Sequence, residues 1–183
     1  RDWSSDVCSS DLTHAIIMND IGGMDMNVFV KAVHSDKAPK ALGPYSQATK
    51  LGDFVYLSGQ LGIDPNTGEL AGETMKEQAE QAMKNIGAVL AEMGLRYDHI
   101  MKTTIFVKDL NDFDALNEVY AGFLEEPYPA RSCVEVSRLP KGALVEIECL
   151  AIDTLVYEQQ MAAQQGGCSS CGGGCDSGSC SGC

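Results

Sequence analysis

Apolar and polar residues alternate in short runs near the start of the patterned region. Residues 28–35 are rich in Val and Phe and predict a strand. Residues 46–51 and 54–60 flank Gly52-Asp53, a dipeptide that favours a tight turn between two strands. The pattern therefore predicts one strand followed by a β-hairpin.

Two helical repeats follow. Thr74 and Glu77 have the spacing of a capping box, and Gly94 is a typical helix stop. The apolar stripe of this first helix comprises Met75, Ala79, Ala82, Met83, Ile86, Val89, Leu90 and Met93. Residues 101–109 predict a β-branched strand, and Asn111 is expected to cap a second helix. The stripe of that helix comprises Phe113, Leu116, Val119, Tyr120 and Phe123.

The last regular segments are two strands. Residues 131–139 alternate, with Arg131 and Cys133 on one face and Ser132 and Val134 on the other. Pro140-Lys141-Gly142 turns the chain into a strand at 144–153. The order β-β-β-α-β-α-β-β predicts an α+β domain, with a mixed sheet and two helices packed on one of its faces.

The two ends of the chain do not share this pattern. Residues 1–25 show neither the helical nor the strand periodicity of hydrophobic residues. We interpret them as a disordered leader that is not native, with Met26 as the hypothetical natural start. The folded domain is expected to span 26–155. Residues 156–183 are interpreted as a linker and a disordered tail rich in Cys, Gly and Ser.

Charge and composition narrow the functional classes. The 183 residues are 44% hydrophobic and 21% charged, a normal mixture for a globular protein, and the net charge is −13. A nucleic-acid binder needs Lys and Arg on the phosphates, so this acidic chain is a poor candidate. Apolar runs are too short to span a membrane, and no signal sequence is evident, so we expect a cytoplasmic protein without membrane contact.

Most catalytic motifs are missing. The sequence has no HExxH and no phosphate-binding P-loop, and none of its three histidines stands in a motif that suggests a catalytic base. Arg131 remains as a candidate, because an arginine at the start of a strand can bind a carboxylate through two parallel hydrogen bonds. An ordinary surface or interface ion pair is the alternative interpretation of Arg131.

Five segments, in this order, carry a specific resemblance. They are Gly43-Pro44-Tyr45-Ser46-Gln47-Ala48, Ser58-Gly59-Gln60, residues 102–110 (KTTIFVKDL), residues 129–136 (PARSCVEV) and Val145-Glu146-Ile147-Glu148. Over residues 29–153 the chain resembles the RidA/YjgF family of reactive-intermediate deaminases. The stretch between Asn117 and Arg131 looks shorter than in typical members, which leaves the preferred substrate size open.

The resemblance implies a chorismate-mutase-like fold, a homotrimer with sites between subunits, and no cofactor. It implies hydrolysis of 2-imino or enamine acids, such as 2-iminobutanoate and 2-iminopropanoate, to 2-oxo acids and ammonia. These unstable compounds leave pyridoxal-phosphate-dependent dehydratases, which are therefore the expected functional partners. Two other functions stay open: an endoribonuclease or translation inhibitor, as some relatives have been described, and a non-catalytic holdase or regulatory binding module of the same fold.

By the same resemblance, Arg131 would bind the substrate carboxylate, and Glu146 would handle the attacking water or the imino nitrogen. Pocket-lining positions carried over from the family are Tyr45, Ser58, Gly59, Asn117 and Cys133. Each has a simpler interpretation: Tyr45 as a core or interface aromatic, Glu146 and Asn117 as surface residues, and Cys133 as a small packing residue.

The C-terminal cysteines lie outside the resemblance. They are Cys168, Cys171, Cys175, Cys180 and Cys183, and they include two CxxC pairs. This spacing suits zinc or an iron–sulfur cluster, whereas the intervening Gly and Ser residues supply no fold to enclose a metal. A metal-binding or redox tail and an inert tail are both open.

Overall fold

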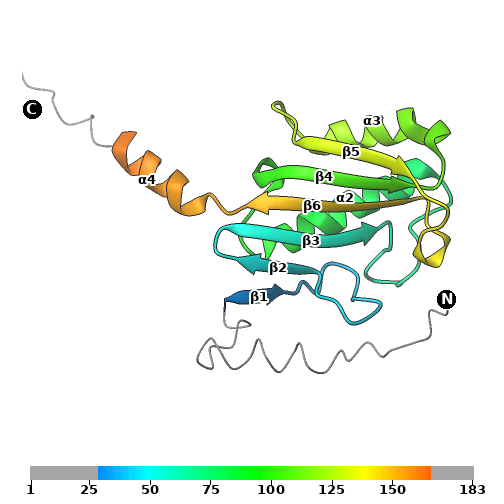
Figure 1. Ribbon diagram of the computed structural model, residues 1–183, viewed down its shortest axis with the longest axis horizontal. Helices are drawn as coiled ribbons and strands as arrows, with labels where there is room; N and C mark the ends of the chain where they lie inside the picture. The colour runs from blue at the N-terminus through cyan, green and yellow to red at the C-terminus, as the bar shows by residue number, and fades with distance from the viewer. Residues whose placement is uncertain (1–28, 166–183) are drawn as a thin grey trace, which may run out of the picture.

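Strands β2 (Ala48–Leu51) and β3 (Phe54–Leu61) form the predicted hairpin in the computed structural model, which describes residues 29–165. Gly52 at its turn has φ +58°, a conformation that glycine adopts without strain. The sheet also contains β1 (Val30–Val33), β4 (Ile100–Val107), β5 (Ala130–Glu135) and β6 (Val145–Ile152). The strand order is β1-β2-β3-β6-β4-β5 (Figure 1). Because β4 and β5 are parallel and the other neighbours antiparallel, the prediction of a mixed sheet is confirmed.

Helix α2 (Met75–Ala91) begins and ends where its sequence predicts. Thr74 and Glu77 form the capping box, with the Thr74 backbone N–H donating to Glu77 over 3.0 Å. After the helix, Gly94 has φ +73° and the Leu95 N–H donates to the Leu90 carbonyl, which closes the last turn. All the predicted stripe residues except the partly buried Met93 are buried.

Helix α3 (Phe113–Phe123) begins later than predicted. The expectation that Asn111 caps it is wrong, because the Asp109 carboxylate accepts the Asn111 backbone N–H over 2.8 Å and holds residues 110–112 in a short 3-10 turn. Asp112 then precedes the helix without a side-chain cap. Two further 3-10 turns occupy Tyr97–His99 and Pro140–Gly142.

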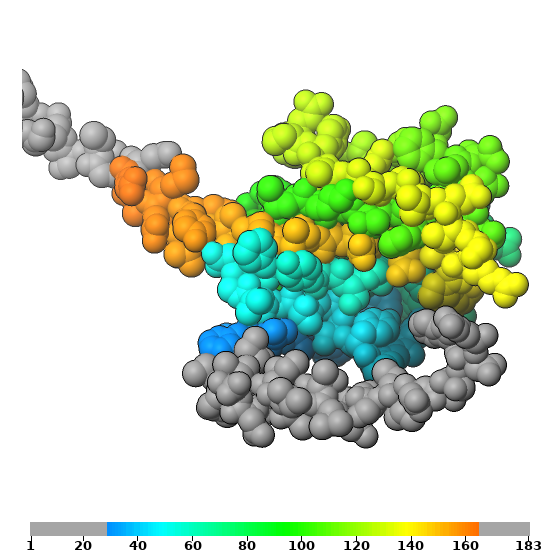
Figure 2. All heavy atoms as spheres, viewed as in Figure 1, coloured from blue at the N-terminus to red at the C-terminus, as the bar shows by residue number. Residues whose placement is uncertain are grey.

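Both predicted helices cover one face of the sheet, as expected. Helix α2 packs on β3 and β6, and α3 packs on α2 (Figure 1). In β6 the buried residues Val145, Ile147 and Cys149 alternate with Glu146 and Glu148, so the two carboxylates point to the other face. We call that second face the open face; Figure 2 shows it in the same view.

Two strands are shorter than the sequence predicts. The strand expected at 28–35 is β1 at Val30–Val33, and the strand expected at 131–139 ends at Glu135. A single hydrogen bond from the Val136 N–H to the Val107 carbonyl continues the β4–β5 pairing by one residue. The loop then turns away, because β4 itself ends at Val107 and offers no further partner.

Residues assigned to a linker form a helix instead. Helix α4 (Leu155–Gln165) projects beyond the end of β6 (Figure 1). Its first turn is held by contacts with the domain: Leu155 packs on the core, and Tyr157 donates to Asp53 over 3.1 Å. These contacts are long-range, and the sequence of α4 has no strong amphipathic repeat that would have revealed them.

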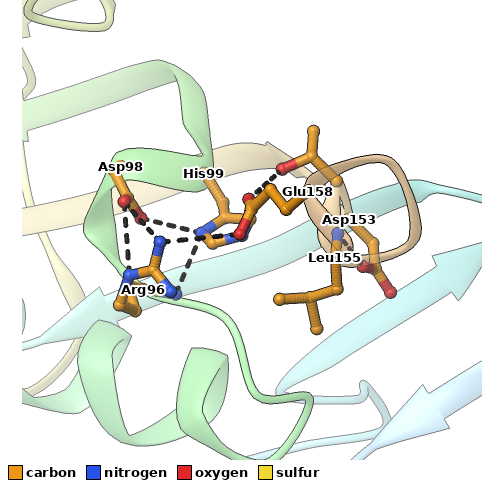
Figure 3. Close-up of polar contacts among 7 residues, drawn as sticks. Arg96, Asp98, His99, Asp153, Leu155 and Glu158 are labelled. Atoms are coloured by element: carbon orange, nitrogen blue, oxygen red, sulfur yellow. Dashed lines mark hydrogen bonds and ion pairs between the residues drawn. The ribbon is translucent and has the colours of Figure 1, made fainter. Parts of the chain in front are cut away.

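Glu158 provides the charged part of this contact (Figure 3). One of its carboxylate oxygens lies 3.2 Å from Nε2 of His99, a side chain that is 1% exposed, and also accepts from the Thr154 hydroxyl over 2.6 Å. Nδ1 of His99 faces Asp98 over 2.8 Å, and Arg96 binds Asp98 over 2.8 Å. The first turn of α4 therefore places a carboxylate beside a buried imidazole nitrogen that has no hydrogen-bond partner among the described residues.

The leader at 1–25 and the five tail cysteines lie outside the described residues. No helix within 29–165 has both the length and the apolar stretch that crossing a bilayer requires.

An ion pair at the start of α4 gives the first prediction. One Asp153 oxygen binds Lys50, and the other accepts the Leu155 N–H over 3.2 Å. The hydrogen bond from Lys50 is the main cause that lowers the pKa of Asp153, although burial opposes it. Lys50→Met is expected to reduce the free energy of unfolding by roughly 1–2 kcal/mol at pH 7.

The sign of its pH dependence follows from linkage. A carboxyl whose pKa is lower in the folded chain stabilises the fold above its unfolded value of about 3.9, and this contribution is lost as pH falls through the folded value. The difference between wild type and Lys50→Met should therefore vanish in acid, as measured by urea unfolding from pH 7 to pH 2.5. Lys31→Met, at the exposed position that pairs with Lys50 across β1 and β2, is the control. A deficit that persists at the lowest pH would contradict the assignment to this ion pair.

Candidate functional site

Four of the seven predicted site residues line one cleft. Tyr45, Ser58, Gly59 and Glu146 surround a space of about 320 Å³ beside the end of β3 and the start of β6. The resemblance also named Arg131, Asn117 and Cys133, and the structure places these three elsewhere, between β5 and α3. The sequence-based site therefore falls into two groups, which we call the Glu146 cleft and the Arg131 cradle.

A bulge in β3 shapes the Glu146 cleft. The pairing of β3 with β6 shifts register between Leu57 and Gln60, so Ser58 and Gly59 stand out of the regular ladder. A Cβ atom on Gly59 would lie 1.9 Å from a Glu146 carboxylate oxygen. Glycine at this position lets the carboxylate lie directly against the β3 backbone.

The segment between β1 and β2 forms the opposite wall. The buried Gln47 side chain accepts the Ser35 N–H over 2.6 Å and donates to the Ser35 and Pro39 carbonyls over 3.1 and 2.8 Å. The Tyr45 hydroxyl accepts the Leu42 N–H over 3.0 Å, which leaves its ring half exposed. Gln47 thus holds this wall together through its hydrogen bonds, and both Gln47 and Tyr45 line the cleft.

The Glu146 carboxyl is electrostatically perturbed. Burial raises its pKa above the ordinary value, and the Glu148 carboxylate, two residues along the same face of β6, raises it further. A higher pKa brings a carboxyl closer to neutral pH, where it can both accept and donate a proton.

Arg131 is held by one face of α3. Its Nη1 donates to the Asn117 side-chain oxygen over 2.8 Å, and its guanidinium carbon lies 5.4 Å and 5.1 Å from the ring centres of Phe113 and Tyr120. The Tyr120 hydroxyl is joined by a hydrogen bond of 2.7 Å to Thr103 on β4. In this structure Asn117 therefore binds the Arg131 side chain. The resemblance had assigned Asn117 to the lining of the pocket.

Cys133 lies two residues further along the same face of β5, next to Arg131. Burial raises the pKa of its thiol, and the Arg131 guanidinium offsets part of that rise. Since the thiolate is the nucleophilic form, this environment supports the interpretation of Cys133 as a packing or pocket-lining residue.

Arg131 and Glu146 point to opposite faces of the sheet. Arg131 pairs with Thr103, whose side chain is buried beneath α3, whereas Glu146 pairs with Phe106 and leaves β6 on the open face. Side chains of one strand change face at every residue, so these positions fix the two directions. Within a single copy of the chain, the two groups do not share a site.

Sequence reasoning missed two residues of the cradle. Phe113 and Tyr120 were assigned to the buried stripe of the second helix; Tyr120 is buried there, whereas Phe113 is only partly buried and lies outside the core cluster. Their spacing from Asn117, four residues before and three after, places all three on one helix face and could have indicated a shared role.

Within residues 29–165, no group of three His, Cys, Asp or Glu side chains is arranged to hold a metal ion. The candidate metal ligands of the sequence, Cys168, Cys171, Cys175, Cys180 and Cys183, lie outside this range.

Comparison with known proteins identifies the family. Residues 35–153 match the model of a family described as endoribonuclease L-PSP. The chain belongs to this family, which includes RidA and YjgF. Helix α4 lies beyond the matched region of the RidA domain.

Relatives of known name extend the comparison. The mouse protein named 2-iminobutanoate/2-iminopropanoate deaminase is 40% identical over 126 residues, which cover 69% of this chain and 93% of the mouse protein. The crystal structure of RidA from an Antarctic Psychrobacter is 49% identical, with a TM-score of 0.65 over 67% of this chain and 98% of that one. Escherichia coli TdcF with bound serine is 43% identical, with a TM-score of 0.64 and the same coverage of both chains.

The environment of Glu146 gives the second prediction. Glu148→Gln should lower the pKa of Glu146, because it removes a like charge, and Gly59→Ala should lower it more. The added methyl group occupies the place of the flexible carboxylate, which must turn out of its buried position into water. Titration of the ¹³C-labelled glutamate carboxyls by NMR measures both shifts. An unchanged Glu146 pKa in Gly59→Ala would show that the bulge does not determine its burial.

Proposed function

We propose that the protein hydrolyses small 2-imino acids and their enamine forms to 2-oxo acids and ammonia. Arg131 binds the substrate carboxylate, and Glu146 moves protons between water and the imino nitrogen. The main support for this proposal is a pair of groups in the structure. One is the Arg131 guanidinium, held in an aromatic cradle, and the other is the Glu146 carboxyl, whose pKa is raised. The 40% identity to the mouse deaminase supports the same activity.

Arg131 suits recognition of a small carboxylate. A guanidinium has five N–H donors, and the described residues give it one hydrogen bond, to Asn117. The remaining donors can bind both oxygens of a carboxylate in parallel. The TdcF structure, with its bound serine, is consistent with a ligand of this size in a close relative.

The chemistry asks little of the protein beyond positioning and proton transfer. Water adds to the imino carbon while the imino nitrogen gains a proton, which gives a tetrahedral carbinolamine. The carbon–nitrogen bond then breaks, ammonia leaves, and the hydroxyl oxygen becomes the carbonyl of the 2-oxo acid. Glu146 takes a proton from water in the first step and returns one to the leaving nitrogen. Water is the second reactant, and the reaction involves no change of oxidation state.

The directions of Arg131 and Glu146 require a site that is shared between copies. In this proposal Arg131 of one copy and Glu146 of a neighbour meet at a subunit interface of a homotrimer. The apolar side chains on the open face, among them Phe54, Tyr56 and Val134, are each about half exposed and offer a surface for such contact. The expected suppliers of substrate are enzymes that release enamines from amino acids, such as pyridoxal-phosphate-dependent dehydratases.

The family description also names an endoribonuclease. Cleavage of RNA requires that the protein holds a phosphate backbone, and this chain has 13 Lys and Arg against 26 Asp and Glu. Its charge does not favour that activity, so deamination is the function we propose.

The third prediction tests the two roles separately. Threonine dehydratase generates 2-iminobutanoate, and semicarbazide traps whatever is not hydrolysed. Wild type should suppress trapping, whereas Arg131→Ala and Glu146→Gln should each lower kcat/KM by about 10²-fold or more. Lys84→Met, at an exposed position of α2 on the opposite side of the sheet from the open face, is the control. Full suppression by Arg131→Ala would refute the proposed function.

The fourth prediction tests the shared site. Arg131→Ala and Glu146→Gln chains are expressed together with different affinity tags, and mixed oligomers are isolated through both tags. If Arg131 and Glu146 come from neighbouring copies, one site of each mixed trimer is intact, so activity should return to roughly one third of wild type. If one copy supplied both groups, mixing would restore nothing.

A further inference from the structure

The strongest feature that the proposed chemistry leaves unexplained is the cradle around Arg131. Phe113, Asn117 and Tyr120 come from successive turns of α3 and meet the same guanidinium. An arginine can attract a carboxylate by its charge alone, and it does not need two aromatic rings for that purpose. Their attraction to the cation acts through the ring faces, so it constrains where the guanidinium lies.

Tyr120 is itself fixed in place. Tyr120 is only 5% exposed. Its hydroxyl shares the 2.7 Å hydrogen bond with the hydroxyl of Thr103, which is fully buried. Thr103 lies on β4 directly opposite Arg131 in the parallel ladder. The strand next to Arg131 thus determines where one wall of the cradle stands.

Such an arrangement reduces the conformational entropy that the Arg131 side chain loses when it binds a ligand. A free arginine side chain has many rotamers, and ordering it on a ligand weakens binding. In the cradle, Asn117 fixes one end of the guanidinium and the rings restrict its plane. The donors that remain are already oriented before a carboxylate arrives.

We propose that Phe113 and Tyr120, with Thr103 behind Tyr120, are positioning residues that preorganise Arg131 and so determine the selectivity of the site for substrates with a free carboxylate. This inference rests on the proposed function for the identity of the substrate. It concerns recognition of the carboxylate, which can be measured without turnover.

The test compares 2-oxobutanoate, the product, with 2-oxobutanamide, in which the carboxylate is replaced by a neutral amide. The affinity of each is measured on the full chain by calorimetry or NMR titration. Phe113→Leu should weaken binding of the acid by about tenfold and leave binding of the amide unchanged. KM for 2-iminobutanoate should rise more than kcat falls, because the carboxylate is bound in both the ground state and the transition state.

Two further sets of variants separate positioning from packing. Phe123→Leu makes the same change at the other end of α3, where the ring packs on Tyr97 at 5.7 Å and not on Arg131. It should leave the ratio of acid to amide affinity unchanged, and Phe113→Tyr should keep the wild-type ratio. Tyr120→Phe and Thr103→Val each remove one partner of the same hydrogen bond, so each should lower the ratio about threefold, and the double variant no further.

The outcomes distinguish this inference from the proposed function. If Phe113→Leu weakens acid and amide equally, or leaves both unchanged, the positioning role is overturned, whether or not wild type hydrolyses imines. If wild type fails to hydrolyse imines but the ratio still falls in Phe113→Leu, the positioning role is supported and the proposed reaction is wrong.

Discussion

The alternation of side chains along β5 and β6 is the constraint on which the whole site depends. Strand β5 directs Arg131 towards the helices, and β6 directs Glu146 towards the open face. These directions are set by the register of each strand, which its buried neighbours hold. A reaction that uses both groups must therefore use two copies of the chain. Under the proposed function, assembly is a condition of catalysis, since a single copy would hold only half of each site.

The order of strands and helices could be predicted because its signals are local. The capping box at Thr74, the stop at Gly94 and the turn at Gly52 each act within a few residues. The predictions that were wrong concern residues whose structure depends on distant contacts, or on a second side chain that competes for the same backbone N–H. Asp109 takes the Asn111 N–H that a cap would have left free, and α4 contacts His99 and Asp53, which lie about sixty and a hundred residues earlier. Neither outcome is visible in a hydrophobic pattern.

The resemblance named one set of site residues and implied sites between subunits, and within one copy the structure holds these residues in two groups. The alternation along β5 could separate Arg131 from Ser132, but neither it nor the resemblance says which face of the sheet the helices cover. The resemblance also could not separate chemistry from architecture within a motif. In the segment from Gly43 to Ala48, Gln47 and Tyr45 both line the cleft, but Gln47 also ties the chain to Ser35 and Pro39. A matching motif thus locates a site, and hydrogen bonds assign the roles within it.

The open face links assembly to acid–base strength. Glu146 shares that face with Phe54, Tyr56 and Val134, and burial is already the main cause of its raised pKa. In the proposed trimer, a neighbouring copy that covered these apolar side chains would also remove water from the carboxyl, which would move its pKa further in the same direction. The arriving Arg131 opposes this, since a cation close to a carboxylate favours the charged form. The substrate carboxylate neutralises that cation when it binds. In the proposed reaction, substrate binding would therefore raise the pKa of Glu146 at the stage where the leaving nitrogen needs a proton.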